Sequence, residues 1–290
     1  MKIISKFILV VFFVLISFFT YLTFVGIETN KFNQQILNEI KKINKDIKVD
    51  LKDIKLVLDP FKLKLFTKTI GTKIQNQNKI IEIENIKAQI SLKSIISNKF
   101  LIEKIKVSTK SIEIIELIKF IRTFKRSPEL FFLEKFIKRG YLIANIEIEF
   151  DDQGKIKDNY KINGFVKDAK FQSIKKFNVE KLNFVFDSEK DLISLVDLKF
   201  SLNKLDLFSE KIDINLIKDE FLISGQINHK EFEFSNDDLG FFIKLFTPEL
   251  KIEKLILSSK NTFSFFLNKK FKVKDFEIDS KIFINNLLIA

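Results

Sequence analysis

Apolar residues run without interruption near the start of the chain. Lys2 and Lys6 precede an uncharged segment, Phe7–Ile27, made mostly of Phe, Val, Leu and Ile. A helix of roughly 21 residues is about 31 Å long, which is enough to cross the hydrocarbon core of a bilayer. The segment is longer than the apolar part of a typical signal peptide, and no small-residue cleavage pattern follows it. We therefore predict an uncleaved transmembrane signal anchor over residues 1–27.

The lysines before this segment predict its orientation. The positive-inside rule places Met1 in the cytoplasm and the chain after Glu28 on the far side of the membrane. The remainder is also rich in lysine, and distant charges have a small effect on topology, so the reverse orientation stays open as an alternative.

After the anchor the hydrophobic period changes twice. Apolar residues first recur at helical spacing, which predicts a short amphipathic helix over Phe32–Ile43. From Ile47 they alternate with polar residues, as in a strand whose two faces differ. The alternation slips by one residue at Asp53, which predicts a bulge or a bend.

Strand-like alternation continues through Ile54–Leu58 and Phe61–Leu65 and then returns ten more times, which gives about a dozen candidate strands in all. It covers Ile81–Leu92, Ile105–Val107, Ile146–Phe150, Tyr160–Val166, Leu182–Phe186, Leu198–Leu202, Ile212–Leu216, Phe221–Ile227, Phe263–Leu267 and Phe271–Ile278. Asp151–Gly154 is predicted as a hairpin turn. Strands with one apolar and one polar side are typical of an antiparallel sheet that has one solvated face and one apolar face.

Two helical segments interrupt the strands. The first is Ile112–Phe124, and the second is predicted to start at Ser127, with Pro128 at its first position, and to end near Arg139. Gly140 is predicted to take the left-handed position after that helix.

The pattern predicts a fold that is mainly β with some α. We divide it into the anchor 1–27, an N-terminal helix and first sheet section 28–110, a helical insert 111–140 and a second sheet section 141–290. A shorter helix is predicted over Asp238–Phe246. The chain finishes in an apolar run from Ile282, so we expect either a fragment or a last strand whose edge needs a partner.

Composition narrows the possible functions. The chain has no cysteine, which excludes disulfides, thiolate metal sites and thiol nucleophiles, and its single histidine, His229, excludes a two-histidine metal site. None of the seven glycines forms a phosphate-binding turn. We expect no cofactor, no metal and no enzymatic activity, although a carboxylate site stays open. His229 is predicted to lie at the surface.

The charge balance says little about partners. The net charge is +12, from 50 Lys and Arg against 38 Asp and Glu, and lysine-rich chains are common in AT-rich genomes. A basic excess suits an anionic membrane surface. The anchor and the lack of a basic helix or stacking module argue against nucleic acid.

The order of these parts resembles the AsmA-like family of bacterial envelope proteins, relatives of TamB and of the bridge-like lipid transfer proteins. The resemblance rests on the anchor, the helix Phe32–Ile43, the stretch from Ile47 through Pro60 to Leu65, the strands Ile81–Leu92 and Leu101–Val107 with the crossing segment Ser94–Phe100, and the hairpin-like segment Phe150–Ala169. It implies a long, curled, taco-like antiparallel sheet whose groove conducts phospholipid acyl chains. It also implies a single-pass protein of the bacterial inner membrane, with its bulk in the periplasm and a role in outer-membrane lipid homeostasis. Family members are commonly longer, so we expect a short or truncated member.

Acyl chains need only continuous apolar surface shielded from water. The candidate groove lining consists of alternating apolar residues: Leu56, Leu58, Phe61, Leu63, Ile81, Ile83, Ile90, Leu92, Ile148, Phe150, Phe184, Phe186, Phe200, Phe263 and Phe265. The alternative is that these residues fill an ordinary closed core, which alternation alone does not distinguish.

The charged candidates each have a structural explanation beside the functional one. Arg122, Arg126 and Arg139, with Lys125, Lys135 and Lys138, are candidates for binding lipid phosphates, or they form a solvated helix face. Asp151-Asp152 and Asp237-Asp238 are better explained by a turn and a helix N-cap than by an acid–base or metal site.

Two functions remain. The first is a membrane-anchored module that binds or transfers lipid along an open greasy groove. The second is a membrane-tethered structural or assembly scaffold with a closed β core that binds envelope proteins.

Overall fold

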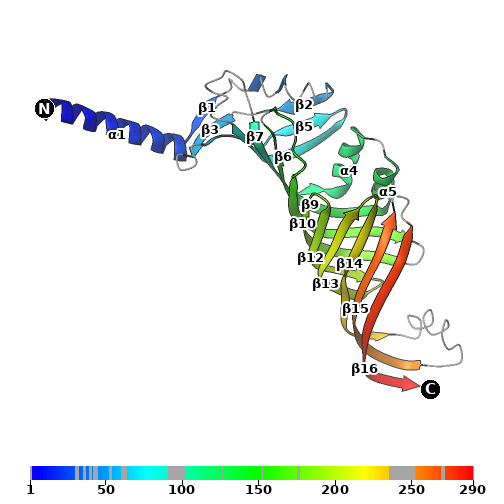
Figure 1. Cartoon of the computed structure of the whole chain (residues 1–290). Coiled ribbons are helices and arrows are strands. Elements are labelled where there is room, and N and C mark those ends of the chain that lie inside the picture. Colours follow the sequence, from blue (N-terminus) through cyan, green and yellow to red (C-terminus); the bar gives the residue numbers. More distant parts are fainter. Residues whose placement is uncertain are drawn as a thin grey trace. The chain divides into compact units, whose positions relative to one another are not determined.

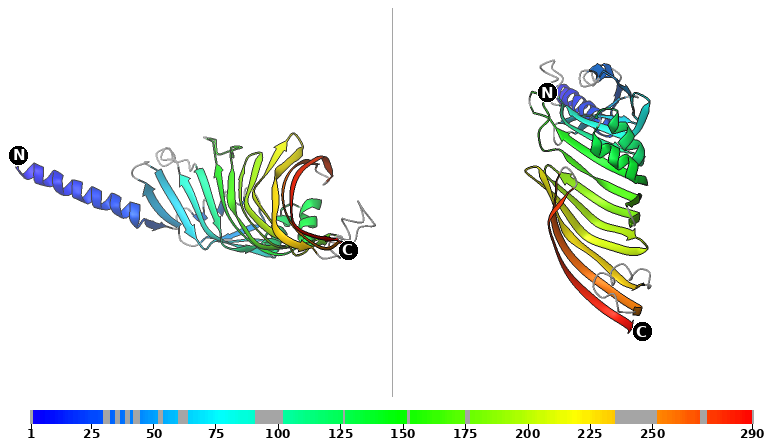
Figure 2. Two further views of the ribbon diagram at one scale, coloured as in Figure 1. Left: turned by 90° about the horizontal axis from the view of Figure 1, so that it is seen from below. Right: turned by 90° about the vertical axis from the view of Figure 1, so that its right-hand side faces the viewer.

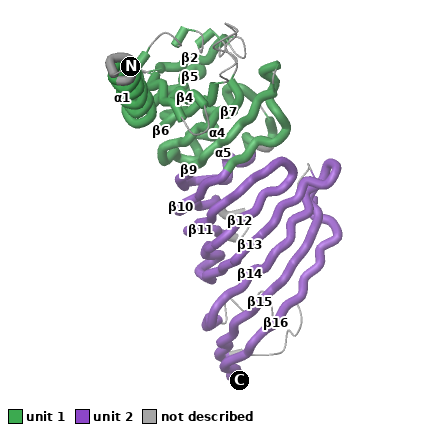
Figure 3. Tube along the Cα trace, turned by 60° about the vertical axis from the view of Figure 1, so that its left-hand side comes forward, with its two compact units in different colours: residues 1–131, 143–162 green, residues 132–142, 163–290 purple. Residues whose placement is uncertain are grey.

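The computed structural model is mainly antiparallel β-sheet, with three helices among the residues it describes (Figure 1). The described residues are 2–29, 33–34, 37–38, 41, 45–51, 54–59, 64–90, 102–125, 127–151, 153–174, 177–234, 252–268 and 272–289. The chain divides into two compact units (Figure 3). Unit 1 consists of residues 1–131 and 143–162, and unit 2 of residues 132–142 and 163–290.

The strands hydrogen-bond in an order that follows the sequence closely. The elements of unit 1 are α1 (Lys2–Phe24), β1 (Ile27–Thr29), β2 (Ile47–Asp50), β3 (Ile54–Asp59), β4 (Lys64–Ile70), β5 (Lys73–Asn76), β6 (Lys79–Ile90), β7 (Ile102–Thr109), β8 (Ile112–Glu113) and α4 (Ile114–Arg122). The three elements α5 (Pro128–Phe136), β9 (Ile137–Glu149) and β10 (Lys161–Ile174) have residues in both units. The main path in unit 1 is β1-β3-β4-β6-β7-β9, while β5 joins β2 to β6 and β8 pairs with β9.

Helix α1 projects beyond the strands of unit 1 in Figure 1 and in the left view of Figure 2. Its segment Lys6–Phe24 has a mean hydropathy of 2.6 and no buried residue, so it is long and apolar enough to cross a membrane. The helix ends at Phe24, three residues before the predicted end of the anchor. Gly26 follows in the left-handed region (φ +73°), and Ile27 begins a strand instead of finishing the span.

The slip in alternation at Asp53 separates two strands and is not a bulge within one strand. β2 pairs with β5, whereas β3 pairs with β1 and β4. Asp53 itself lies outside the described residues. The predicted helix Phe32–Ile43 is described at only five positions, all of them helical, and the crossing segment Ser94–Phe100 and the helix Asp238–Phe246 lie outside the description.

The core of unit 1 is closed by α4. Ile81, Ile83 and Ile112 form a buried cluster, and Leu117 and Phe120 of α4 pack against it. The helix forms because one side of the segment is apolar at helical spacing while Glu116 and Lys119 occupy the other, where they form an ion pair at 2.7 Å.

The second helix of the insert starts as predicted and ends earlier. The backbone N–H of Leu130 donates to Ser127 Oγ at 3.3 Å, which is the expected N-cap. Helix α5 ends at Phe136, and Lys138, Arg139 and Gly140 belong to β9. The prediction that Gly140 ends a helix is wrong, because pairing into the sheet overrides the local cap signal.

Unit 2 is built almost entirely of long strands that lie beside one another in sequence order (Figure 2). They are β10 (Lys161–Ile174), β11 (Phe177–Glu189), β12 (Leu192–Leu202), β13 (Leu205–Ile217), β14 (Glu220–Phe234), β15 (Ile252–Asn268) and β16 (Val273–Ile289). The turn between β12 and β13 is short. Its residues Asn203 and Lys204 both have positive φ, which is typical of a two-residue type I′ turn.

The predicted fold class is confirmed as mainly antiparallel β with an N-terminal apolar helix and few other helices. The sheet path is open, with β1 and β16 at its two ends among the described strands. The curled, taco-like shape that the resemblance implied stays a prediction.

Candidate functional site

Residues paired across the strands of unit 2 form rows that share one face of the sheet. Directly opposed side chains point to the same face, and successive residues along a strand alternate between faces. One row consists of Phe186, Leu195, Ile212, Gly225, Phe263 and Ile278. The next row on the same face consists of Ser188, Ile193, Ile214, Ile223 and Phe265. We call the surface formed by these two rows the apolar face.

The row of residues between these two rows is polar, and its side chains lie on the opposite face of the sheet. It consists of Asp187, Ser194, Asp213, Ser224, Ser264 and Glu277. Ser194 Oγ donates a hydrogen bond to Asp213 Oδ1 at 2.5 Å, and Lys211 lies 2.8 Å from the same carboxylate. Burial raises the pKa of Asp213, but the hydrogen bonds from Lys211 and Ser194 outweigh burial and hold this pKa below its ordinary value.

The apolar face has no second layer among the described residues. Ile212 is buried by its neighbours in the sheet, most other members are half-buried, and Ile278 at the edge is 57% exposed. No described helix makes more than marginal contact with the strands of unit 2. A sheet with one apolar face normally buries that face against another layer, so this surface is a candidate for binding an apolar ligand.

Glycine at one position lets the rows pack closely. A Cβ at Gly225 would lie 2.8 Å from the backbone oxygen of Lys211 and 2.9 Å from Cγ1 of Ile212. Ile212 therefore fills the space in front of Gly225, and the apolar row continues across β14.

Four of the predicted lining residues belong to or adjoin the apolar face. Phe186, Phe263 and Phe265 are members, and Phe184 lies two residues before Phe186 on the same strand. The ring centroids of Phe184 and Phe186 are 6.3 Å apart, and those of Phe263 and Phe265 are stacked at 5.9 Å. Phe200 is half-buried and pairs with Leu207.

The predicted lining residues of unit 1 divide between core and half-buried positions. Ile81 and Ile83 lie in the cluster closed by α4, and Ile90 is 2% exposed, so all three occupy core positions. The half-buried ones are Leu56, Leu58, Ile148 and Phe150. The remaining three, Phe61, Leu63 and Leu92, lie outside the described residues.

The structure does not describe the three arginines as one cluster. Arg126 lies outside the described residues. The guanidinium of Arg122 lies 5.2 Å from the centroid of the Phe131 ring in unit 1. Arg139 lies in unit 2, near Glu180. The Glu180 pKa is held below its ordinary value mainly by the hydrogen bond from Lys170, with smaller contributions from Asn178 and the charge of Arg139.

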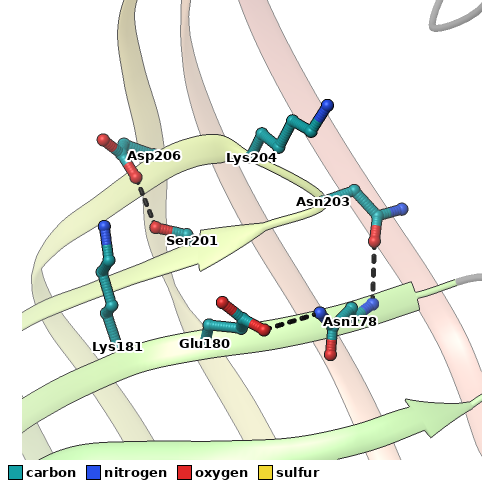
Figure 4. A pocket seen from close by; sticks show the side chains of 7 residues that line it. All are labelled: Asn178, Glu180, Lys181, Ser201, Asn203, Lys204 and Asp206. Atoms are coloured by element: carbon teal, nitrogen blue, oxygen red, sulfur yellow. Dashed lines mark hydrogen bonds between the residues drawn. The ribbon is translucent and has the colours of Figure 1, made fainter.

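Glu180 lines a polar hollow of about 670 Å³ beside the turn between β12 and β13 (Figure 4). The other lining residues are Asn178, Lys181, Ser201, Asn203, Lys204 and Asp206. The carboxylates are already engaged: Glu180 lies 2.6 Å from Lys170 Nζ, and Asp206 accepts a hydrogen bond from Ser201. The hollow therefore presents lysines and amides to solvent, and its lining residues include no nucleophile–base pair.

His229, predicted at the surface, is buried. It is 8% exposed on β14, where it is paired with Leu207 and Ser259. Its Nδ1 lies 2.7 Å from the backbone oxygen of Lys230, and its ring packs edge-on against Phe234. The prediction failed because the predicted strand ends at Ile227, whereas β14 continues to Phe234 and pairs His229 with both neighbouring strands.

The acidic pairs give no catalytic or metal site among the described residues. Asp151 Oδ1 accepts hydrogen bonds from the backbone N–H groups of Gln153 and Lys155, as in the predicted turn. These bonds, led by that of Lys155, hold the Asp151 pKa below its ordinary value. Asp152, Asp237 and Asp238 lie outside the description, and no described group of His, Asp or Glu side chains is arranged to hold a metal ion.

Sequence reasoning missed the central members of the apolar face. Leu195, Ile193 and Ile223 were visible as alternating residues but were not among the candidate lining positions. The signal that identifies them is their alignment with Phe186, Phe263 and Phe265, which requires the register of strands distant in sequence.

Comparison of the chain with protein-family models, with curated proteins and with solved structures gives no match.

Proposed function

We propose that this protein is a membrane-anchored β protein that binds or conducts phospholipid acyl chains on the apolar face of unit 2. In this proposal it is held in a bacterial inner membrane by α1, with the sheet in the periplasm, and it contributes to outer-membrane lipid homeostasis. The function is binding, with no catalytic step.

The observation that carries the proposal is the pair of aligned apolar rows with no described covering layer. Acyl chains lack directional groups, and each methylene removed from water contributes about 0.8 kcal/mol. Two adjacent rows, composed mostly of Phe, Leu and Ile and spanning six and five strands, give a chain of methylenes a continuous contact surface. The polar row on the opposite face keeps that side in water.

The rest of the chain is consistent with such a role. Helix α1 would keep the sheet at a membrane, where its ligands are concentrated. The lysines of the polar hollow, Lys181 and Lys204, and the nearby Arg139 would favour anionic headgroups over cationic ones.

A second candidate is a tethered scaffold that binds envelope proteins. The observation that favours it is the closed core of unit 1, in which Ile81, Ile83 and Ile112 are covered by α4. If unit 2 is covered in a similar way by a partner protein, its apolar face would be an interface with that protein.

The test compares two neighbouring positions on β15. Phe265→Asp places a carboxylate on the apolar face, while the matched control Ser264→Asp places the same group on the polar face one residue away. The full chain is purified in detergent from cells, and phospholipid bound per protein is measured by mass spectrometry together with the melting temperature. We expect Phe265→Asp to lower bound phospholipid about tenfold, because a charge in contact with hydrocarbon is unfavourable, and Ser264→Asp to leave it unchanged.

The same measurements separate the two candidates. A melting temperature that falls by more than about 10 °C for Phe265→Asp alone would identify Phe265 as a core position. No phospholipid on the unaltered protein, with a stoichiometric protein partner in its place, would replace the lipid proposal with the scaffold.

A further inference from the structure

Strand β16 is a long exposed edge. All 17 of its residues are exposed, and β15 is its only partner among the described strands. Its second half, Ile282–Ile289, contains no charged residue and no proline. In this half the exposed fractions of large apolar side chains range from 44% for Leu287 to 59% for Ile284. Soluble sheets usually protect such edges with charges, proline or short strands, because a free edge pairs readily with another strand.

We propose that the free edge of β16 pairs with β16 of a second copy of this chain. The two strands are antiparallel, and the two-fold axis passes midway between Ser280 of one copy and Ser280 of the other. This inference is independent of lipid binding. It assigns the edge to a second copy of the chain, and it is argued from the possible registers of β16, from its charged residues and from the side of the sheet on which each of its residues lies.

Symmetry limits the possible registers. A two-fold axis perpendicular to a sheet leaves each side chain on the same face of the sheet. Directly opposed residues also share a face, so one residue of β16 must lie opposite its own symmetry mate, with the axis between the two. With the axis at Ser280, Asp279 of each copy is opposite Lys281 of the other. The interface then contains two symmetric Asp–Lys pairs. An axis one residue earlier puts Ile278 and Ser280 opposite each other, and an axis at Ile278 opposes Glu277 with Asp279, which repel.

The same register continues the apolar face into the second copy. Ile278 pairs with Phe263 of the apolar face, and Ile282, four residues on, shares its side of β16. About Ser280, Ile278 is opposite Ile282 of the second copy, and Phe276 is opposite Ile284. Phe276 already packs on Phe265, with ring centroids 6.1 Å apart. Apolar cross-strand pairs of this kind stabilise antiparallel strands.

The charges of β16 indicate a partner on the free side. Lys281 is directly opposite Lys260 of β15, and neither forms an ion pair with a described residue. Like charges in direct opposition destabilise a strand pair. Asp279 of a second copy would lie on the other side of Lys281 and would compensate this repulsion.

Crosslinking tests the position of the axis. The chain has no cysteine, so a single introduced thiol can crosslink two copies only through the same residue of each copy. Mild oxidation of membranes that contain the full-length Ser280→Cys variant should give a covalent dimer, because residues opposed on an axis have Cβ atoms about 4.5–5.5 Å apart. Asn286→Cys is the matched control on the same exposed edge, since its symmetry mate would be twelve residues away, roughly 40 Å.

Charge reversal tests the pairing itself. Asp279→Lys in the Ser280→Cys background places a second lysine opposite Lys281 across the interface and should weaken self-association about tenfold. The double change Asp279→Lys with Lys281→Asp restores opposite charges and should restore the crosslinked dimer. Because both residues are exposed, the single variant should melt at the same temperature as the unaltered protein.

Each other outcome overturns the proposal. Absence of a Ser280→Cys dimer, a stronger crosslink at Asn286→Cys, or failure of the double change to restore dimer contradicts pairing about Ser280. A crosslink to a different protein would assign the edge to that protein.

Discussion

At the scale of single residues, Gly26 joins the apolar helix to the sheet. It combines a left-handed backbone, φ +73°, with a position where an added Cβ would lie 2.5 Å from the backbone oxygen of Leu56. Gly154 has a similar φ of +78° but has nothing within 4 Å of an added Cβ. Comparison of the two glycines therefore distinguishes the cost of a left-handed backbone alone from the cost of a left-handed backbone combined with steric overlap.

We predict that Gly26→Ala destabilises unit 1 by about 2–3 kcal/mol and that Gly154→Ala does so by about 1 kcal/mol. A left-handed alanine costs about 1–2 kcal/mol, and at Gly26 β1 must also shift away from β3. Chemical denaturation of the full chain in detergent measures both. Equal losses for the two variants would show that β1 moves without cost, and would contradict the close contact with Leu56.

At the scale of elements, β7 and β9 are joined by a ladder of charged pairs. Lys104 lies 2.9 Å from Glu149 and also bonds Glu147, whose other oxygen bonds Lys106 at 2.5 Å. The hydrogen bond from Lys104 is the main reason that the pKa of Glu147 lies below its ordinary value, and the bond to Glu147 is the main reason that the pKa of Lys104 lies above its own.

These shifts predict a stability plateau with two limits. A lowered carboxylate pKa gives stability that is complete above the unfolded value of 4.5 and is lost as the pH falls through the folded value. A raised lysine pKa gives stability that is complete below the unfolded value of 10.5 and is lost as the pH rises through the folded value. The ion pairs of the ladder therefore contribute their full stabilisation between pH 4.5 and pH 10.5.

We predict that Glu147→Gln lowers the stability of unit 1 by about 1 kcal/mol at pH 7 and that this difference becomes smaller as the pH falls below 4.5. Melting curves at pH 7 and pH 3 measure it. The control is Glu84→Gln, since Glu84 is exposed on β6 and forms no ion pair with a described residue. A Glu147→Gln effect that is as large at pH 3 as at pH 7 would assign it to packing instead of charge.

The elements that the sequence predicts well are those with local signals. Alternation predicts the strands of unit 2, and Ser127 and Pro128 predict the start of α5. The predictions fail where hydrogen-bonded pairing between strands distant in sequence determines the structure. Gly140 has the local features of a helix end, yet pairing draws residues 137–140 into β9. His229 is buried because of its register with Leu207 and Ser259, which no local pattern contains. The apolar face was predicted in part, since its phenylalanines were identified but their alignment with Ile193 and Ile223 was not.

At the scale of the whole molecule, α1 is long and apolar enough to cross a membrane, and the chain has no cysteine, so an introduced thiol can report on which side of a membrane the sheet lies. Lys2 and Lys6 flank the start of α1, so the positive-inside rule predicts a cytoplasmic N-terminus and a sheet on the opposite side.

We predict that a membrane-impermeant maleimide labels Glu210→Cys on β13 in intact spheroplasts, and labels Ser5→Cys only after lysis. Glu210 is exposed and forms no ion pair with a described residue, so the substitution should not disturb the sheet. Labelling of Ser5→Cys in intact spheroplasts would reverse the orientation and place the sheet in the cytoplasm. Loss of residue 5 from the mature protein would instead make α1 a cleaved signal sequence, and the apolar face would then have to meet its ligand without a tether. For the proposed lipid binding, the orientation decides which membrane leaflet the apolar face would meet.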